Sequence, residues 1–323
     1  MIRLDKIKII SHIENIKILN EDVFENKVID GCIIEQRYTM KSPYSLYVEE
    51  DYKENELVLE FSGKILKDDY PNIINKDNIH TCLSNINDLG FCRLNIDAIL
   101  HDGDVVKADV CADIEYPDCE ALTQALHIGV CNFKKYLVRN VGTNLIIEKN
   151  VQTKGRKIRL TIYDKSKEIQ RAENRNFLFS LDNYQVLINY FCGKVRFELN
   201  LKSKEQLRNK LRILSTNILS VLHATANPIW EMLDEAIENT ESNKVCRNLT
   251  EFKNQLLLEY CGNDLAKVEA LLRNYYSPNT HISKIMKPYR VLVSKLTGIF
   301  NPSIKQELRN LLFVIVILVG IFT

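Results

Sequence analysis

Three segments of this chain alternate apolar and polar residues with a period of two, and this pattern limits its possible folds more than any other feature. The segments are VVKADVCADIE (105–115), KIRLTIY (157–163) and KVRFELNL (194–201). Successive side chains of a β-strand point to opposite faces of the sheet, so each segment has one apolar and one polar face. The pattern therefore predicts three strands of a sheet that packs on one side and presents charged side chains on the other.

If these strands share one sheet, its polar face gathers carboxylates, arginines and a tyrosine. The residues are Asp109, Asp113, Arg159, Tyr163, Arg196 and Glu198. Carboxylates hold hard cations such as Mg²⁺ or Mn²⁺, which polarise a phosphate, while arginines balance its charge. A tyrosine hydroxyl beside them is a nucleophile for phosphodiester transfer. The alternative is an ordinary half-solvated sheet, whose outward charges form cross-strand pairs.

The spacing of the two aspartates limits the metal site. Asp109 and Asp113 are four residues apart on one predicted strand, which separates them by roughly 13 Å at about 3.3 Å per residue. They cannot both bind one ion unless the strand bends. We expect one of them to hold the metal with Glu198, and the other to orient an arginine or to support the sheet.

Other segments extend the predicted sheet and cover it. Further strand-like runs occupy 2–10, 44–50, 55–63 and 143–149, and helical patterns occupy 77–89, 118–129 and 203–214. Because the strands are not separated by regular crossover helices, we predict an α+β fold, an antiparallel sheet with helices packed on one face.

The strand signals end near residue 215. Helical patterns follow at 248–260 and 264–276. We therefore predict two domains, a catalytic domain over 1–215 and a smaller helical C-terminal domain over 216–323.

The chain ends in an apolar tail, residues 311–323, without a single charge. A membrane span needs about 20 such residues, so we expect a buried C-terminal helix or strand. An aberrant end of the reading frame and a membrane-associating tail are the alternatives.

The cysteines and the N-terminus indicate a reducing compartment. None of the nine cysteines forms a Cys-x-x-Cys pair, and the first residues lack the apolar core of a signal peptide. We predict a cytoplasmic protein without a membrane partner.

A net charge of +1 conceals two basic segments. Residues 134–175 hold twelve Lys or Arg and four Asp or Glu, residues 196–214 hold six and two, and the rest of the chain sums to −11. Such segregation is typical of a polyanion-binding surface, although solvated basic helices also produce it. We predict DNA contacts by Lys134, Lys135, Arg139, Lys154, Arg156, Lys157, Arg159 and Arg171.

The order of three motifs resembles that of a known family. KADVCADI (107–114), TIYDKSKEI (161–169) and VRFELNL (195–201) follow one another along the chain. This succession is similar to the rolling-circle replication initiators, above all the phage and plasmid replication proteins of the filamentous-phage gene II type and the related Rep_trans initiators. The resemblance covers about residues 1–215. The chain departs from the wider superfamily in having no His-hydrophobe-His metal motif, and the Rep_trans-like branch is similar in relying on carboxylates.

The resemblance implies an enzyme that nicks one DNA strand at a replication origin and forms a covalent phosphotyrosine intermediate. It implies Tyr163 as the nucleophile, with Lys167 and Arg196 in the catalytic site and Mg²⁺ or Mn²⁺ as the cofactor. The implied metal ligands are Asp109, Asp113 and Glu198.

A protein of this type serves a phage or plasmid in a bacterial host, with a helicase and a polymerase of the host as further partners. Tyr136, inside the first basic segment, is the rival nucleophile. The alternative functions are a nucleic-acid-binding regulator without catalysis and an interaction protein tethered by its apolar tail.

Overall fold

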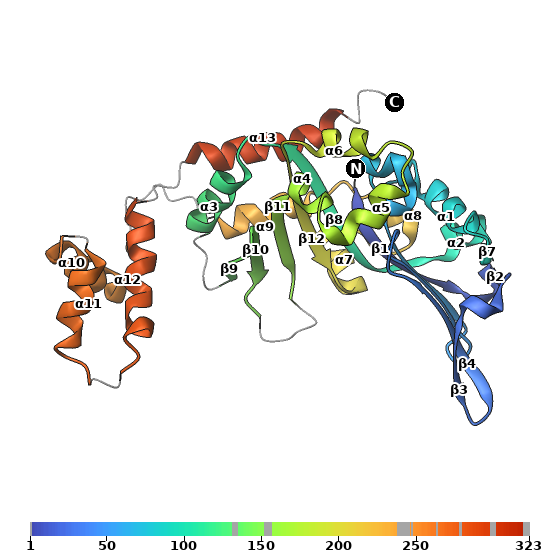
Figure 1. Ribbon diagram of the computed structural model, residues 1–323, viewed down its shortest axis with the longest axis horizontal. Helices are drawn as coiled ribbons and strands as arrows, with labels where there is room; N and C mark the ends of the chain where they lie inside the picture. The colour runs from blue at the N-terminus through green and yellow to red at the C-terminus, as the bar shows by residue number, and fades with distance from the viewer. Residues whose placement is uncertain are drawn as a thin grey trace.

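A computed structural model of the chain describes residues 2–130, 135–151, 157–237, 246, 248–262, 264–277, 280–297 and 302–318. Within these ranges a ten-stranded sheet runs through the molecule in the order β3-β4-β5-β6-β1-β8-β12-β11-β10-β9 (Figure 1), and β2 and β7 form a separate pair. The strands are β1 (Leu4–His12), β2 (Ile16–Ile18), β3 (Glu25–Ile29), β4 (Cys32–Met40), β5 (Leu46–Asp51), β6 (Glu56–Ser62), β7 (Cys92–Leu94), β8 (Asp104–Glu115), β9 (Tyr136–Val141), β10 (Asn144–Lys149), β11 (Arg159–Asp164) and β12 (Lys194–Leu201).

The fold class predicted from the sequence is confirmed. Each of the seven predicted strands is present, and the strand pairs of the large sheet are antiparallel. The sequence did not reveal β3, β4 or β9. Strand β3 is exposed along its whole length, so it lacks the apolar alternation that identifies a half-buried strand.

Several helices pack on the apolar face of the sheet. Helix α3 contacts β10 and β11, α9 contacts β8 and β12, α7 and α8 contact β8, and α2 contacts β1. Leu160, Phe197 and Leu199 are fully buried beneath these helices. The helices are α1 (Ile79–Asn87), α2 (Ile96–Asp102), α3 (Cys119–Gly129), α7 (Lys204–Leu211), α8 (Ile218–Leu222) and α9 (Pro228–Ala236).

Polar side chains begin the helices where the sequence predicted them. Asp118 accepts a hydrogen bond from the backbone N–H of Ala121 at the start of α3, and Ser203 accepts one from Gln206 at the start of α7. Such caps satisfy N–H groups that have no partner inside the helix.

The opposite, polar face is covered at one end only. The 3₁₀ segment η3 (Gly63–Asn72) and the helices α4 (Lys165–Ile169), α5 (Arg175–Phe179) and α6 (Tyr184–Phe191) lie over this end. Tyr70 of η3 and Phe191 of α6 place their rings against the guanidinium of Arg196, whose side chain has no exposed surface. Over the rest of the face, Lys6, Glu60 and Glu198 remain partly exposed. The sequence predicted helices on one face of the sheet only, whereas η3, α4, α5 and α6 cover part of the other face as well.

The helical C-terminal region divides into two parts rather than forming the single domain expected over 216–323. Helices α8, α9 and α13 (Pro302–Leu318) bury their apolar residues in the core of the sheet domain, because Val221, Leu233 and Leu308 belong to that core. Helices α10 (Leu249–Tyr260), α11 (Leu265–Arg273) and α12 (Ile282–Thr297) have a core of their own, and Figure 1 shows them as a separate group at one end of the molecule.

The described part of the apolar tail is helical. In α13, Leu308 and Leu312 are buried, and the amide of Asn227 donates to the carbonyl of Leu312 (3.3 Å). Among the described residues, no helix combines the length and the apolar character needed to cross a membrane.

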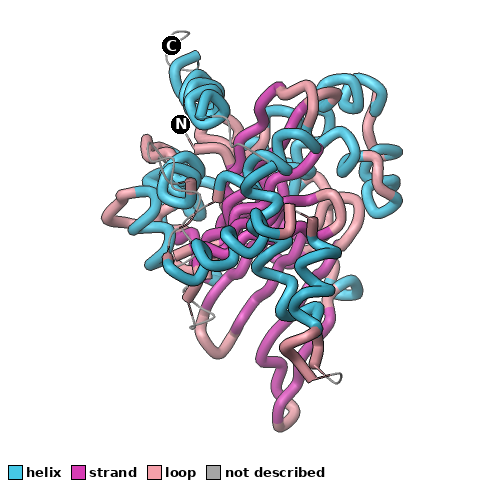
Figure 2. Tube along the Cα trace, turned by 90° about the vertical axis from the view of Figure 1, so that its left-hand side faces the viewer, coloured by secondary structure: helices cyan, strands magenta, loops and turns pink. Residues whose placement is uncertain are grey.

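The β3–β4 hairpin extends beyond the helices. Figure 2 shows its two strands at the lower end of the molecule, with the connecting turn at the tip. Asp30 and Gly31 both have positive φ in this turn, which is the geometry of a tight two-residue hairpin.

Candidate functional site

Polar residues of neighbouring strands stand side by side on the partly covered face of the sheet. The strand register sets them in three rows, Tyr163–Arg196–Asp113, Thr161–Glu198–Cys111 and Arg159–Asn200–Asp109–Lys6. The expectation that the polar sides of the three strands share one face is confirmed. The first row lies under the covering helices, and the third lies on the open part.

Arg196 lies at the covered end of this face. Its Nε and Nη2 donate to the two carboxylate oxygens of Asp113, each over 2.6 Å. Its Nη1 donates to Asp5 and to the hydroxyl of Tyr70 (3.2 Å for Tyr70). Every nitrogen of the guanidinium is occupied within the protein, so Arg196 is not available for the phosphate contact that the sequence suggested.

Asp113 and Lys165 complete the covered cluster. Both oxygens of Asp113 are held by Arg196, so Asp113 is the aspartate that orients an arginine. Lys165 donates to the hydroxyl of Tyr70 (2.9 Å) and pairs with Glu168. Burial opposes ionisation of Asp5, yet Arg196 and Lys165 hold the pKa of Asp5 below its ordinary value. The cluster is a network of charges that neutralise one another.

Tyr163 lies on the border between the covered and the open parts. The ammonium of Lys165 is 5.9 Å from the centre of its ring, and its hydroxyl donates to Oε2 of Glu198 over 3.0 Å. Only 7% of Tyr163 is exposed.

The surroundings of Tyr163 do not favour its phenolate. Burial and then the negative charge of Glu198 raise the pKa of Tyr163 well above its ordinary value. The group bonded to the hydroxyl is the carboxylate of Glu198, which disfavours a second negative charge beside it.

Glu198 and Asp109 meet at the amide of Asn200. The Nδ2 of Asn200 is 2.8 Å from Oδ1 of Asp109 and 3.3 Å from Oε1 of Glu198. Burial, followed by the charges of Asp5 and Asp109, raises the pKa of Glu198 to about 7. Burial also raises the pKa of Asp109. Two desolvated carboxyl groups that face one point are stabilised in their charged forms by a cation.

These two carboxylates fit a Mg²⁺ or Mn²⁺ ion. Mg²⁺ in proteins is held by one or two carboxylates and completes its coordination with water and substrate phosphates. In the ranges that the structure describes, no third His, Cys, Asp or Glu joins Asp109 and Glu198 in a group whose ligand atoms lie within 4.8 Å of one another. Asp109, Asp113 and Glu198 therefore do not form the trio of ligands that the resemblance implies.

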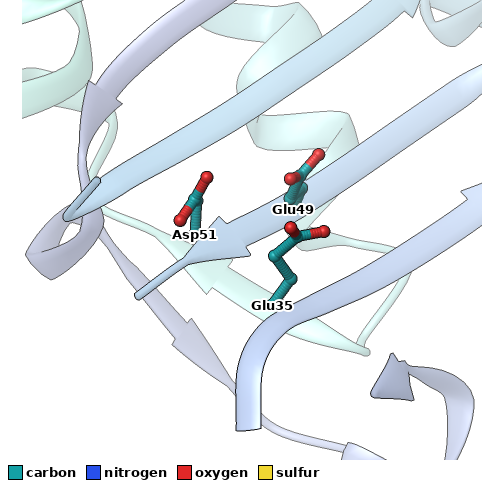
Figure 3. Close-up of side chains that lie close together, drawn as sticks. All are labelled: Glu35, Glu49 and Asp51. Carbon is teal, nitrogen blue, oxygen red and sulfur yellow. The ribbon is translucent and has the colours of Figure 1, made fainter. Parts of the chain in front are cut away.

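Another group of carboxylates lies on strands β4 and β5. Figure 3 shows Glu35 on one strand facing Glu49 and Asp51 on the next, and their ligand atoms lie within 4.8 Å of one another. Each already has a partner within the chain. Lys27 and Arg37 bind Glu35, Tyr47 donates to Glu49, and Asp51 accepts from the backbone N–H of Lys53 (2.9 Å).

Three other predicted residues lie away from Glu198. Lys167 is exposed over 69% of its side chain and pairs with Asp164 (3.7 Å), because the first turn of α4 directs Lys165 inward. Arg171 is exposed next to Glu173. Tyr136 lies on the opposite face of the sheet, where its hydroxyl donates to Glu235 over 2.7 Å.

The predicted DNA-binding residues are placed in part. Lys134, Lys154 and Arg156 lie outside the described residues. Lys135 and Lys157 are exposed. Arg139 and Arg159 are on the polar face and share Glu148 as their partner, at 3.3 and 2.7 Å.

Four residues of the site were missed from the sequence. They are Asp5, Tyr70, Lys165 and Asn200. Asn200 follows Glu198 by two positions, so strand alternation places it on the same polar face but gives it no role there. Tyr70 comes from a 3₁₀ segment without a periodic pattern, so only the tertiary structure reveals it.

Comparison with known proteins gives no independent identification. A scan against protein-family models finds no match to this chain, and a search of the curated proteins finds none either. The function is therefore inferred from the geometry of the polar face and from the motif order.

Proposed function

We propose that this chain is a replication initiator that nicks one DNA strand at an origin and joins the cut strand to Tyr163, as in rolling-circle replication. The observation that carries the proposal is the hydrogen bond from the Tyr163 hydroxyl to Glu198, on the part of the sheet where Glu198 also faces Asp109 across Asn200. A nucleophile, a proton acceptor and a pair of carboxylates for a hard cation thus occupy adjacent positions.

The transfer step uses Tyr163 and Glu198 together. The phenol oxygen attacks the phosphorus of a phosphodiester, and the bond from phosphorus to a sugar oxygen breaks. The phenol proton passes to Oε2 of Glu198, which already accepts the hydrogen bond. The released sugar oxygen takes up a proton from solvent and becomes a hydroxyl.

Asp109 and Oε1 of Glu198 would hold Mg²⁺ or Mn²⁺. The ion would supply positive charge to the oxygens of the reacting phosphate. Asn200 fixes the two carboxylates by donating to both. Arg196 does not contact the phosphate in this proposal. It holds Asp113 and Asp5 in place beneath the covering helices.

One observation favours a second function, nucleic-acid binding without catalysis. Tyr163 is buried and its pKa is raised, which disfavours the phenolate. Such a regulator would use the same open face and would form no covalent product.

Detection of the covalent adduct separates the two functions. Single-stranded DNA from the gene and its flanking sequence is labelled, incubated with the protein and Mn²⁺, and run on a denaturing gel. We expect a labelled protein band with the wild type and none with Tyr163→Phe.

Two matched variants control for the loss of any tyrosine. Tyr136→Phe removes the rival hydroxyl on the opposite face, and Tyr184→Phe removes an exposed one. Both should retain the adduct. An adduct that survives Tyr163→Phe, or none at all from the folded wild type, would contradict the proposal.

A further inference from the structure

A hollow of about 340 Å³ lies on the open part of the polar face, lined by β1, which neighbours β8, and by β4, β5 and β6 beyond it. Its lining includes Lys6, Lys8, Lys41, Tyr47, Met40 and Glu60. We propose that this hollow is a nucleotide-binding subsite that holds a phosphate and a base of a single DNA strand beside the Tyr163–Glu198 centre.

The strand register connects the hollow to the centre. Lys6 of β1 lies opposite Asp109 of β8, and Asp109 lies opposite Asn200 of β12. Neighbouring strands are about 4.8 Å apart, so Lys6 is roughly 10 Å from Asn200 across the sheet. A strand of DNA with its reacting phosphate at Glu198 therefore reaches the hollow within a few nucleotides.

The charges of the hollow are not balanced within the protein. Lys8 lies directly opposite Lys107, and like charges in this arrangement destabilise a sheet. Glu60 binds Lys6 (2.7 Å) and Lys107 (3.0 Å). Within the described ranges, no carboxylate lies within 4.0 Å of the ammonium of Lys8 or Lys41. An anionic ligand such as a phosphate supplies the missing charge.

The hollow also offers a surface for a base. Tyr47 lies opposite Glu60 on the same face, and Met40 and Leu46 line the wall beside it. Bases stack on aromatic side chains with little regard to sequence, and neighbouring cations hold the backbone. The hydroxyl of Tyr47 donates to Glu49, which fixes the ring in place.

This subsite directs the DNA toward the N-terminal half of the sheet. The charge of the sequence pointed instead to residues 134–175 and 196–214, where Arg139 and Arg159 are paired with Glu148. Lys8 and Lys41 have no such competitor, so they bind phosphate without first breaking an ion pair.

The affinity for oligothymidylate as a function of salt tests the subsite. Fluorescence anisotropy is measured in EDTA, so that no cleavage occurs, for the wild type and for Lys8→Ala/Lys41→Ala. Each lost phosphate contact reduces the log–log salt slope by about 0.7, so we expect the double variant to lose about 1.4. Tyr47→Leu should weaken binding with little change in the slope, since a lost stacking contact releases no counterion.

The control is Lys17→Ala/Lys267→Ala, which removes two exposed lysines outside the hollow. It should leave the slope unchanged, and thermal unfolding confirms that each variant is folded. Inorganic phosphate, thymidine monophosphate and unlabelled oligothymidylate are added as competitors. If the hollow binds a strand, only the unlabelled oligothymidylate should displace the labelled one at the same concentration. An unchanged slope in Lys8→Ala/Lys41→Ala would overturn the subsite.

The reaction of the bound strand rests on the proposed function, whereas its binding does not. An unchanged salt slope together with a Tyr163-dependent adduct would remove the subsite alone. A reduced slope together with an adduct that survives Tyr163→Phe would remove the proposed nucleophile alone.

Discussion

The two ends of one sheet face hold the same kinds of side chain and use them differently. At the covered end, Arg196 binds Asp113 and Asp5 beneath the rings of Tyr70 and Phe191. At the open end, lysines and carboxylates are partly exposed, and among the described residues no carboxylate lies within 4.0 Å of the ammonium of Lys8 or Lys41. Arginines and aspartates on a strand therefore do not by themselves indicate a catalytic site. Where they are buried, they form ion pairs with one another and are not available to a ligand.

Removal of Arg196 should produce the largest effect. Arg196→Met keeps an unbranched side chain but leaves Asp113 and Asp5 as buried anions without their cation. Breaking a buried ion pair in this way costs about 3 to 5 kcal/mol of unfolding free energy. Urea denaturation measures the loss, and Lys167→Met, which removes an exposed cation, should change stability by less than about 0.5 kcal/mol. Equal stabilities for the two variants would show that the covered cluster is not structural.

Glu198 at the open end should behave in the opposite way. The pKa of Glu198 is raised to about 7 from an ordinary value of 4.5. Between these two pH values the folded protein keeps a proton on Glu198 that the unfolded chain has lost. Its contribution to the unfolding free energy therefore falls as the pH rises from about 4.5 to about 7. Glu198→Gln removes this loss and should be more stable than the wild type by about 3 kcal/mol at pH 8 in EDTA.

Urea denaturation of both proteins at pH 4.5, 6 and 8 checks this sign. The stability difference between variant and wild type should grow with pH. A variant that is less stable than the wild type at pH 8 would show that Glu198 is a stabilising group like those at the covered end. The same variant should form no adduct with DNA, so its stability and its activity change in opposite directions.

The sequence predicted the sheet well because strand alternation is a local property. The runs that became β8, β11 and β12 each showed one apolar and one polar side, and the polar sides share one face as expected. The covered end could not be predicted in this way. Tyr70 and Lys165 are brought over Arg196 by η3 and α4, whose positions depend on contacts between distant parts of the chain.

The charge pattern of the sequence is incomplete for a related reason. Net charge along a segment ignores the anions that the fold supplies from elsewhere, such as Glu148 for Arg159 and Asp113 for Arg196. Among the described residues, no carboxylate lies within 4.0 Å of the ammonium of Lys8 or Lys41, and these two lysines lie outside the basic segments. Whether a cation is free depends on the tertiary structure, which sequence charge does not report.

Binding of a divalent ion should stabilise the open end of the polar face by a smaller amount of unfolding free energy. If Asp109 and Glu198 bind Mn²⁺ in the folded protein alone, a tenfold excess over the dissociation constant stabilises the protein by about 1.4 kcal/mol. Thermal unfolding at pH 7.5 with and without Mn²⁺ measures the gain. Glu198→Gln should lose it, whereas Glu35→Gln, in the acidic group that already has Lys27 and Arg37, should keep it. If Glu35→Gln instead abolishes the stabilisation by Mn²⁺, the ion binds at Glu35, Glu49 and Asp51 and not at Asp109 and Glu198.

The smallest effect concerns two arginine–carboxylate pairs that differ in burial. Arg159 is 2.7 Å from Glu148, and Arg196 is 2.6 Å from Asp113, yet 38% of the Arg159 side chain is exposed and none of Arg196. Exposed pairs contribute about 0.2 to 1 kcal/mol and weaken with salt. A double-mutant cycle with Arg159→Met and Glu148→Gln should therefore give a coupling in this range, and the coupling should decrease at high salt. Because Arg159 must exchange Glu148 for a phosphate if it contacts DNA, weak coupling is a condition of that contact. A coupling above about 2 kcal/mol that persists in salt would mean that Arg159 is held as firmly as Arg196, and would exclude it from the DNA path.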